Sequence, residues 1–199
     1  IIMMVLEKKG NLKTNVYTSN KGNLTFIKSL DQNEWLEDVD NIFNLNNEFM
    51  FKFIDCIKVD NICSVTFGLQ TKDKSTYVLE NKVSEEWENC YTGSDINRFN
   101  LKESTLFFKN NPEEVKAGGS WNMDIHHSKK IVVRQVGNPE PIFAFDNFGY
   151  ATLNTMYSIV IKDDTFSYYY LLAILNSTLI KFYFLSKYSD GKQLFPKVK

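Results

Sequence analysis

The stretch from residue 130 to residue 187 constrains the fold more than any other part of this chain. It opens with KIVVRQ, an apolar, β-branched run that is typical of a buried strand. Two further strands are predicted at residues 142–145 and 150–161, separated by an Asn-Phe-Gly turn. From Tyr168 to about Ser186, apolar side chains recur at helical spacing, which predicts one long helix covered on more than one side. We therefore expect this stretch to supply both a sheet and the helix that packs on it.

The net charge of −1 argues against a chain that binds nucleic acid unaided. The charge is unevenly distributed, however. Residues 1–114 hold 13 Lys and Arg against 18 Asp and Glu, whereas residues 115–199 hold 10 against 6. Because local positive charge attracts phosphate, the second part can contact DNA on one face if a partner domain adds more. With 199 residues, 43% of them hydrophobic, the chain suits one globular domain of ordinary size.

Several segments of the chain together resemble one known domain. KIVVRQVG, GYATLNTMYSIV and YYLLAILNSTLIKFYF are similar to the C-terminal specificity domain of TaqI-like and Eco57I-like adenine DNA methyltransferases and type IIG restriction-modification enzymes. VTFGLQTKDKSTYVL and YTGSDINRF resemble two further blocks of that domain, in the same order, so the resemblance spans roughly residues 65–195. It implies an α+β fold with a mixed, largely antiparallel sheet, flanking helices and a long apolar C-terminal helix. It also implies a role in choosing the DNA sequence that a fused catalytic domain methylates.

Motifs for the methylation chemistry itself are absent from the sequence. Adenine-N6 transfer needs an Asn/Asp-Pro-Pro-aromatic motif that grips the flipped base. The two Asn-Pro sequences of this chain, Asn111-Pro112-Glu113 and Asn138-Pro139-Glu140, lack the second proline and the aromatic residue. No G-x-G turn for a cofactor occurs either. We therefore expect no catalytic residue and no cofactor here, with S-adenosylmethionine held by a methyltransferase domain upstream of Ile1. Residues 1–48 are then strands and a linker joining that domain, and residues 49–199 form the target-recognition domain.

The beginning of the chain carries its own turn signals. Two short alternating segments, VYTSN and LTFIKSL, are separated by Asn-Lys-Gly-Asn, which predicts a hairpin against the opening apolar strand. Residues 31–47 are acidic with apolar residues at approximately helical spacing, which predicts a packed linker. Its carboxylates would repel phosphate, so we expect it to lie away from DNA.

Residues 68–74, Gly-Leu-Gln-Thr-Lys-Asp-Lys, are predicted to form a polar loop before a strand at residues 75–79. The resemblance places the Gln70-Thr71 pair of this loop close to DNA. The Gln70 amide can offer a donor and an acceptor to an adenine edge, while Lys72 and Lys74 can reach phosphates. Any hairpin loop is expected to be polar, so an ordinary surface loop is an equal alternative.

Charged residues in two later blocks need partners. Asp95, in YTGSDINRF, is predicted to cap a turn. Arg98 in the same block either forms a salt bridge, which we favour, or contacts a base. Arg134 lies on an otherwise apolar strand and therefore needs either an internal carboxylate or a phosphate. Both alternatives for Arg134 stay open.

The segment WNMDIHHSKK leads into the main strand, and the resemblance places it near the bound duplex. A basic and aromatic cluster can hold phosphate and stack, and the alternative is a surface turn. Its candidate DNA contacts are Trp121, His126, His127, Lys129 and Lys130.

Residues 150–157 supply the last candidates. Alternation along a strand would place Thr152, Asn154 and Tyr150 on one face, with Leu153 and Thr155 on the other. Polar side chains after a tight turn suit base-edge or backbone contacts. The alternative is that Asn154 stabilises the turn internally.

Metal, membrane and secretion signals are weak. The three cysteines lack paired metal spacing, and the His126-His127 pair has no Cys or carboxylate repeat around it. Asn176, Ser177 and Lys181 interrupt the apolar helix, and the first residues show no signal-peptide pattern. We expect a cytoplasmic protein that makes no membrane contact.

The resulting prediction is a DNA target-recognition fragment whose partners are double-stranded DNA and a fused methyltransferase domain. The alternative is a protein-interaction module that bridges subunits of a restriction-modification complex without base contacts. Positive charge gathered on one face would favour DNA, whereas scattered lysines with an exposed apolar patch would favour a protein partner. A small-molecule enzyme ranks third, since the sequence shows no paired carboxylates, nucleophile-base pair or metal spacing.

Overall fold

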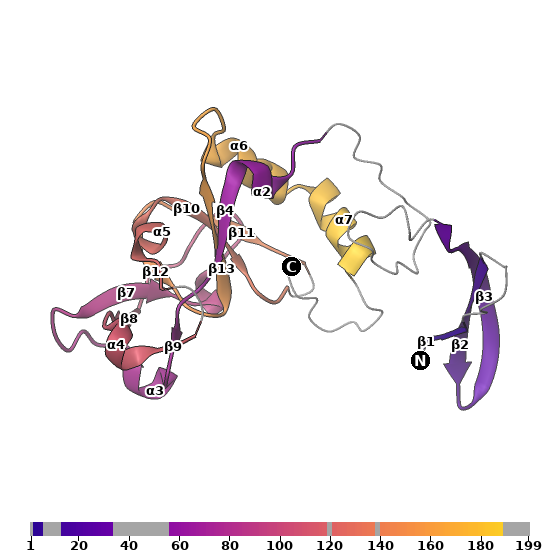
Figure 1. The fold of residues 1–199 in the computed structure, drawn as a ribbon, viewed down its shortest axis with the longest axis horizontal. Coiled ribbons are helices and arrows are strands. Elements are labelled where there is room, and N and C mark those ends of the chain that lie inside the picture. The colour runs from indigo at the N-terminus through magenta and orange to yellow at the C-terminus, as the bar shows by residue number, and fades with distance from the viewer. Residues whose placement is uncertain (1, 6–12, 34–55, 119–120, 138–139, 189–199) are drawn as a thin grey trace. The chain divides into compact units, whose positions relative to one another are not determined.

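A computed structural model describes residues 2–5, 13–33, 56–118, 121–137 and 140–188. The chain divides into two compact units, Ile1–Lys52 with Ser186–Tyr188 and Phe53–Leu185 with Ser189–Lys199. Figure 1 shows the elements of each. The predicted domain boundary between residues 48 and 49 lies outside the described residues, as does most of the predicted acidic linker, and both stay predictions.

The described part of the first unit is an antiparallel three-stranded sheet of β1 (Ile2–Val5), β2 (Lys13–Asn20) and β3 (Asn23–Asp31). A two-residue turn joins β2 to β3, with φ of +49° at Lys21 and +87° at Gly22. Positive φ at both positions matches the twist of a tight hairpin. Thus the hairpin predicted from the Asn-Lys-Gly-Asn signal is confirmed, as is its pairing with the opening strand.

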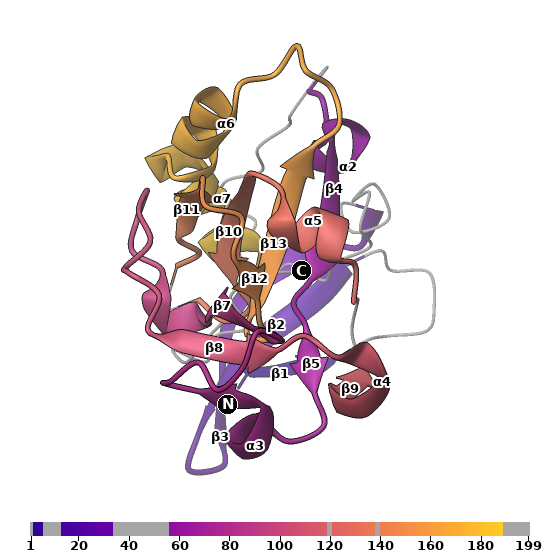
Figure 2. The same ribbon diagram turned by 90° about the vertical axis from the view of Figure 1, so that its left-hand side faces the viewer.

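A four-stranded antiparallel sheet forms the centre of the second unit, in the order β11-β10-β13-β4 (Figure 2). The strands are β4 (Cys63–Phe67), β10 (Lys130–Arg134), β11 (Phe143–Asp146) and β13 (Met156–Ile161). The predicted strand KIVVRQ lies between β11 and β13, which explains its apolar centre, Ile131 to Val133. Ile131 and Val133 pack with Leu171, Leu172 and Leu175 of the covering helix α6 (Tyr168–Leu175).

The single long helix predicted from Tyr168 to Ser186 is wrong. The structure has two helices, α6 and α7 (Thr178–Tyr188), with a 51° bend between them. The Asn176 side chain accepts from Phe143 N–H at 3.1 Å and donates to the Phe143 carbonyl at 2.9 Å. The residue that ends α6 is thereby tied to β11. Among the described residues no single helix is long and apolar enough to cross a membrane. The bent pair of α6 and α7 reaches that length and apolar content only when the two helices are taken together.

A second sheet, β12-β7-β8-β6, is built from shorter strands. β7 and β8 pair antiparallel, as do β6 and β8, whereas β12 runs parallel to β7. The bounds are β6 (Val78–Leu79), β7 (Trp87–Tyr91), β8 (Leu106–Lys109) and β12 (Ala151–Thr152), and a separate pair joins β5 (Gln70–Thr71) to β9 (Lys116–Gly118).

The short helices are α2 (Val59–Ile62), α3 (Lys74–Tyr77), α4 (Pro112–Val115), α5 (Met123–His127) and the 3₁₀ turn η2 (Gly93–Asp95). The predicted α+β class with a largely antiparallel sheet is confirmed.

The strand predicted over residues 150–161 is divided between the two sheets. β12 pairs with β7, a turn at Asn154 and Thr155 follows, and β13 pairs with β10 and β4. Consequently the predicted sharing of one face by Thr152 and Asn154 is wrong, because strand alternation stops at residue 152. Gly68 lies at this crossing, where a Cβ would be 2.0 Å from the Leu153 carbonyl oxygen.

The strand predicted at residues 75–79 is mostly helix. Asp73 caps α3, because its carboxylate accepts from the Ser75 N–H at 2.9 Å and from the Thr76 hydroxyl at 2.8 Å. These hydrogen bonds lower the pKa of Asp73. Only Val78–Leu79 continue as a strand.

Candidate nucleic-acid interface

Two of the predicted DNA contacts, Lys74 and Arg134, line the same open cleft of about 370 Å³. Lys74 begins α3, and Arg134 ends β10. They are sixty positions apart in the chain, and the two sheets bring them together. The full lining is Lys74, Thr92, Gly93, Ser94, Arg134, Gln135, Val136 and Thr155.

The turn that follows β7 forms part of the cleft and is tightly fixed. The Asp95 carboxylate accepts from the Thr92 N–H at 2.7 Å, as predicted for a capping residue. The Gly93 N–H donates to the Thr155 hydroxyl at 2.9 Å. A Cβ at Gly93 would lie 3.3 Å from the Thr155 carbonyl oxygen, closer than an ordinary contact, so glycine suits this approach. These contacts hold the Thr92 to Ser94 edge in place before any ligand arrives.

Two positively charged side chains line the cleft, and none of its described lining residues is Asp or Glu. The Asp95 carboxylate lies next to the lining, where it is bonded to Thr92. In the described part of the chain, neither Lys74 nor Arg134 forms an ion pair. Arg134 donates from Nη2 to the Ile96 carbonyl at 2.8 Å, and its Nε–H is buried without an acceptor among these residues. Because an unpaired guanidinium N–H costs free energy, Arg134 favours a ligand that brings acceptors.

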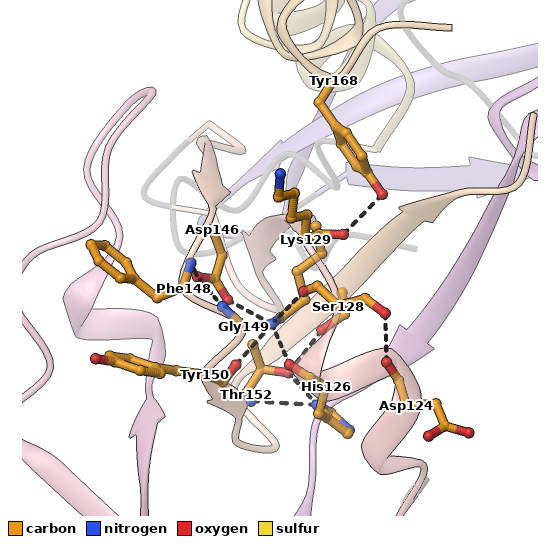
Figure 3. A network of polar contacts seen from close by, with 12 residues as sticks. Asp124, His126, Ser128, Lys129, Asp146, Phe148, Gly149, Tyr150, Thr152 and Tyr168 are labelled. Atoms are coloured by element: carbon orange, nitrogen blue, oxygen red, sulfur yellow. Dashed lines mark hydrogen bonds and ion pairs between the residues drawn. The ribbon is translucent and has the colours of Figure 1, made fainter. Parts of the chain in front are cut away.

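Three other predicted contacts belong to a buried polar network instead (Figure 3). The Lys130 ammonium is fully buried and lies 2.6 Å from the Asp146 carboxylate. It also donates to the carbonyls of His126, Ser128 and Tyr150. Desolvation pulls the pKa of Lys130 below its ordinary value, and the Asp146 charge opposes that shift. The four acceptors explain how a lysine is accommodated here.

His126 and Thr152 form the second half of this network. The Thr152 hydroxyl lies 3.0 Å from His126 Nδ1 and 2.8 Å from the Ser158 hydroxyl, and all three side chains are buried. Lys130, His126 and Thr152 are thus buried with internal partners and offer no surface to DNA in this structure, and their predicted DNA contact stays a prediction. All three side chains are fully buried and form their polar contacts with other residues of the same unit.

The remaining residues of the WNMDIHHSKK segment lie nearer the surface. His127 Nε2 lies 2.8 Å from the Glu88 carboxylate. The Trp121 indole donates to Asn110 at 3.3 Å and packs against the Phe108 ring, so its contacts are structural. Lys129 is exposed, and its carbonyl accepts from the Tyr168 hydroxyl at 2.8 Å. DNA contact by these side chains stays a prediction.

The other candidates do not line the cleft. Gln70 and Thr71 form β5, where Gln70 and the following Lys72 are exposed. Asn154 is half-buried in the turn before β13, and Tyr150 is half-buried between two other rings. Arg98 pairs with Glu140 at 2.9 Å, which confirms its predicted salt bridge.

Sequence reasoning missed most of the cleft lining. Thr92, Gly93, Ser94, Gln135 and Thr155 were not predicted as contacts, although the Thr-x-x-Asp capping pattern at residues 92–95 marks a rigid turn. Gln135 follows Arg134 directly and was readable only as the end of a strand. These lining residues come together only because β7, β10 and β13 meet in space, and local sequence patterns do not predict that arrangement.

Comparison with protein families decides the family. The model of the TaqI-like C-terminal specificity domain matches residues 88–199, more than half of the chain. The chain belongs to this family. A search of curated proteins finds no match. Most of the cleft lies inside the matched region of the TaqI-like specificity domain, including Thr92, Arg134 and Thr155, whereas Lys74 precedes it.

Proposed function

We propose that this TaqI-like specificity domain recognises the target sequence of double-stranded DNA for a fused adenine-N6 methyltransferase. The observation that carries the proposal is the cleft lined by Lys74 and Arg134, neither of which forms an ion pair with any carboxylate of the described residues. The match to the TaqI-like C-terminal specificity domain over residues 88–199 supports the proposal. The catalytic domain, its S-adenosylmethionine and any nuclease activity belong to the rest of the parent enzyme, which we place in the cytoplasm.

A backbone phosphate is the ligand that the cleft fits best. Its oxygens accept hydrogen bonds from ammonium and guanidinium groups, and such contacts set the register of a protein on the duplex. The hydroxyls of Ser94 and Thr155 and the amide of Gln135 line the same cleft and can add hydrogen bonds. Base edges would then be read by exposed polar side chains outside it, with Gln70 and Asn154 as the candidates.

A salt series tests this proposal. We expect the whole chain to bind a random-sequence duplex with an affinity that falls steeply as salt rises, since each phosphate contact releases counterions. The double variant Lys74→Gln/Arg134→Gln should bind more weakly and with a shallower salt dependence. Lys82→Gln is the matched control, because Lys82 is paired with Glu85 at 3.1 Å and lies outside the cleft.

Two results would overturn the proposal. Equal binding and equal salt slopes for the wild type and the double variant would remove the cleft from the interface. Absence of binding at low salt, both for this chain and for the chain joined to its methyltransferase domain, would favour the protein-interaction module that bridges subunits.

A further inference from the structure

The Phe148 side chain is 73% exposed at the tip of the turn between β11 and β12. Leaving an aromatic ring in water forfeits the free energy of burying it. A mobile loop would allow such a ring to fold back onto the protein. The contacts around Phe148 instead hold the turn in one conformation.

Asp146 fixes the backbone of this turn. Its Oδ1 accepts from the Phe148 N–H at 2.9 Å and from the Gly149 N–H at 3.1 Å. Its Oδ2 is held by buried Lys130, as described above. Gly149 has φ of +72°, and a Cβ there would lie 2.2 Å from the His127 carbonyl oxygen, so only glycine fits. The buried network therefore supports the backbone that presents Phe148 (Figure 3).

Stacking fixes the orientation of the ring as well. The Phe148 and Tyr150 rings stack with centroids 5.5 Å apart and planes inclined by 25°. Tyr150 in turn contacts buried Tyr91, at 5.4 Å between centroids. Tyr91 immediately precedes Thr92, which lines the cleft. Two successive ring contacts thus connect the exposed ring to the residue beside the positively charged cleft.

We propose that Phe148, supported by Tyr150, is a stacking platform for a DNA base that has left the base stack. The inference rests on the proposed function and adds a specific contact to it. One face of the Phe148 ring packs on Tyr150, and the exposed remainder offers the flat apolar surface on which any base can stack. The ring contacts from Phe148 through Tyr150 to Tyr91 are what connect this surface to the residue that precedes the cleft lining.

A base fits this ring better than an apolar protein surface does. Protein-docking sites are contiguous apolar patches of several hundred Å². Phe148 is instead flanked in sequence by exposed Asn147 and by Gly149, which offers no side chain. A rigid, exposed ring and a cationic cleft on the same unit are the two elements of a single-strand binding surface, a stacking face and a phosphate contact.

The test uses the whole chain and two duplexes of otherwise identical sequence, one fully paired and one with a single unpaired 2-aminopurine. We expect the wild type to bind the duplex with the unpaired base more tightly and to quench its fluorescence. Phe148→Ala should reduce that preference by between about fivefold and about 150-fold, the range that corresponds to the free energy of base–aromatic stacking. Phe148→Tyr should keep both the preference and the quenching.

Tyr170→Ala is the matched control. Tyr170 is 62% exposed on α6, and the substitution removes a comparable aromatic ring. Unfolding curves establish that each variant folds. A Phe148→Ala variant that keeps the wild-type preference would overturn the platform while leaving salt-dependent duplex binding, and so the proposed function, intact. Absence of binding to both duplexes, by the wild-type chain and by the chain joined to its methyltransferase domain, would overturn both.

Discussion

The Lys130 ammonium nitrogen lies 2.6 Å from the Asp146 carboxylate, and both side chains are fully buried. Lys130 begins β10 and Asp146 ends β11, so the pair joins the two strands at the end where the Phe148 turn leaves the sheet. The same carboxylate orders that turn through its other oxygen. A buried charge pair here has a positional role in addition to any effect on stability.

Replacing Lys130 by Met should destabilise the fold, because the Asp146 carboxylate would stay buried without its cation. Breaking a buried pair in this way costs about 3–5 kcal/mol. The measurement is the free energy of unfolding in urea. Lys129→Met is the control and should change it by no more than about 0.5 kcal/mol, because Lys129 is exposed. The double variant Lys130→Met/Asp146→Asn should recover part of the loss, and equal effects of Lys130→Met and Lys129→Met would contradict the assignment.

Glu140 should make stability depend on pH. Its ion pair with Lys181, at 2.6 Å, and its pairing with Arg98 lower the pKa of Glu140 below its ordinary value of 4.5. A carboxyl group with a lowered pKa in the folded state stabilises the fold above its unfolded pKa, and this contribution disappears as pH falls through the folded pKa. The difference in unfolding free energy between wild type and Glu140→Gln should therefore be present at neutral pH and vanish in acid below 4.5. A difference that is constant across this range would show that the charge is not responsible.

The three cysteines should differ sharply in reactivity. Burial raises the pKa of the Cys90 thiol to about 12, with a smaller contribution from Asp95, and burial also raises the pKa of Cys63. Cys56 is exposed. At about pH 8, close to the ordinary pKa of a thiol, a disulfide reagent should modify Cys56 promptly and the other two only after unfolding. Cys56→Ser should abolish the rapid phase, and rapid labelling of a second thiol in that variant would contradict the burial.

Arg134 should not tolerate lysine. Arg134→Lys keeps the positive charge but loses the planar group that donates to the Ile96 carbonyl at 2.8 Å. We expect weaker duplex binding with a nearly unchanged salt slope, whereas Arg134→Gln should lower the slope by about one. Binding measured from low to moderate salt separates the two effects. Identical slopes for both variants would mean that Arg134 touches no phosphate.

Local patterns predicted the elements whose environment is uniform. The centre of KIVVRQ is apolar because β10 lies between two strands and under α6, and the hairpin of β2 and β3 follows from its turn residues. The helix after residue 168 was correct in type but not in length. Asn176 was recognised in the sequence as a polar interruption of the apolar helix. Its hydrogen bonds to Phe143, at the bend between α6 and α7, could not be predicted, because the two residues are far apart in the chain.

The candidate site was harder to predict because burial of a polar residue leaves no local mark. Lys130 and Lys129 are neighbours of the same type, yet one is fully buried and the other exposed. Arg134 was correctly singled out as a charge in need of a partner. Of its two alternatives, the described residues supply no carboxylate, and only the three-dimensional arrangement shows Lys74 beside it in the cleft.

The pairing of β4 with β13 has a consequence for synthesis of the chain. Residues 63–67 pair with residues 157–161, so β4 leaves the ribosome well before its partner exists. At about 5–20 residues per second, the delay is several seconds. In the last part of that time the apolar strand β10 has also been made and lacks β13 as a neighbour. A nascent chain is thus exposed to aggregation until β13 emerges, and a product truncated before residue 157 would retain that hazard permanently.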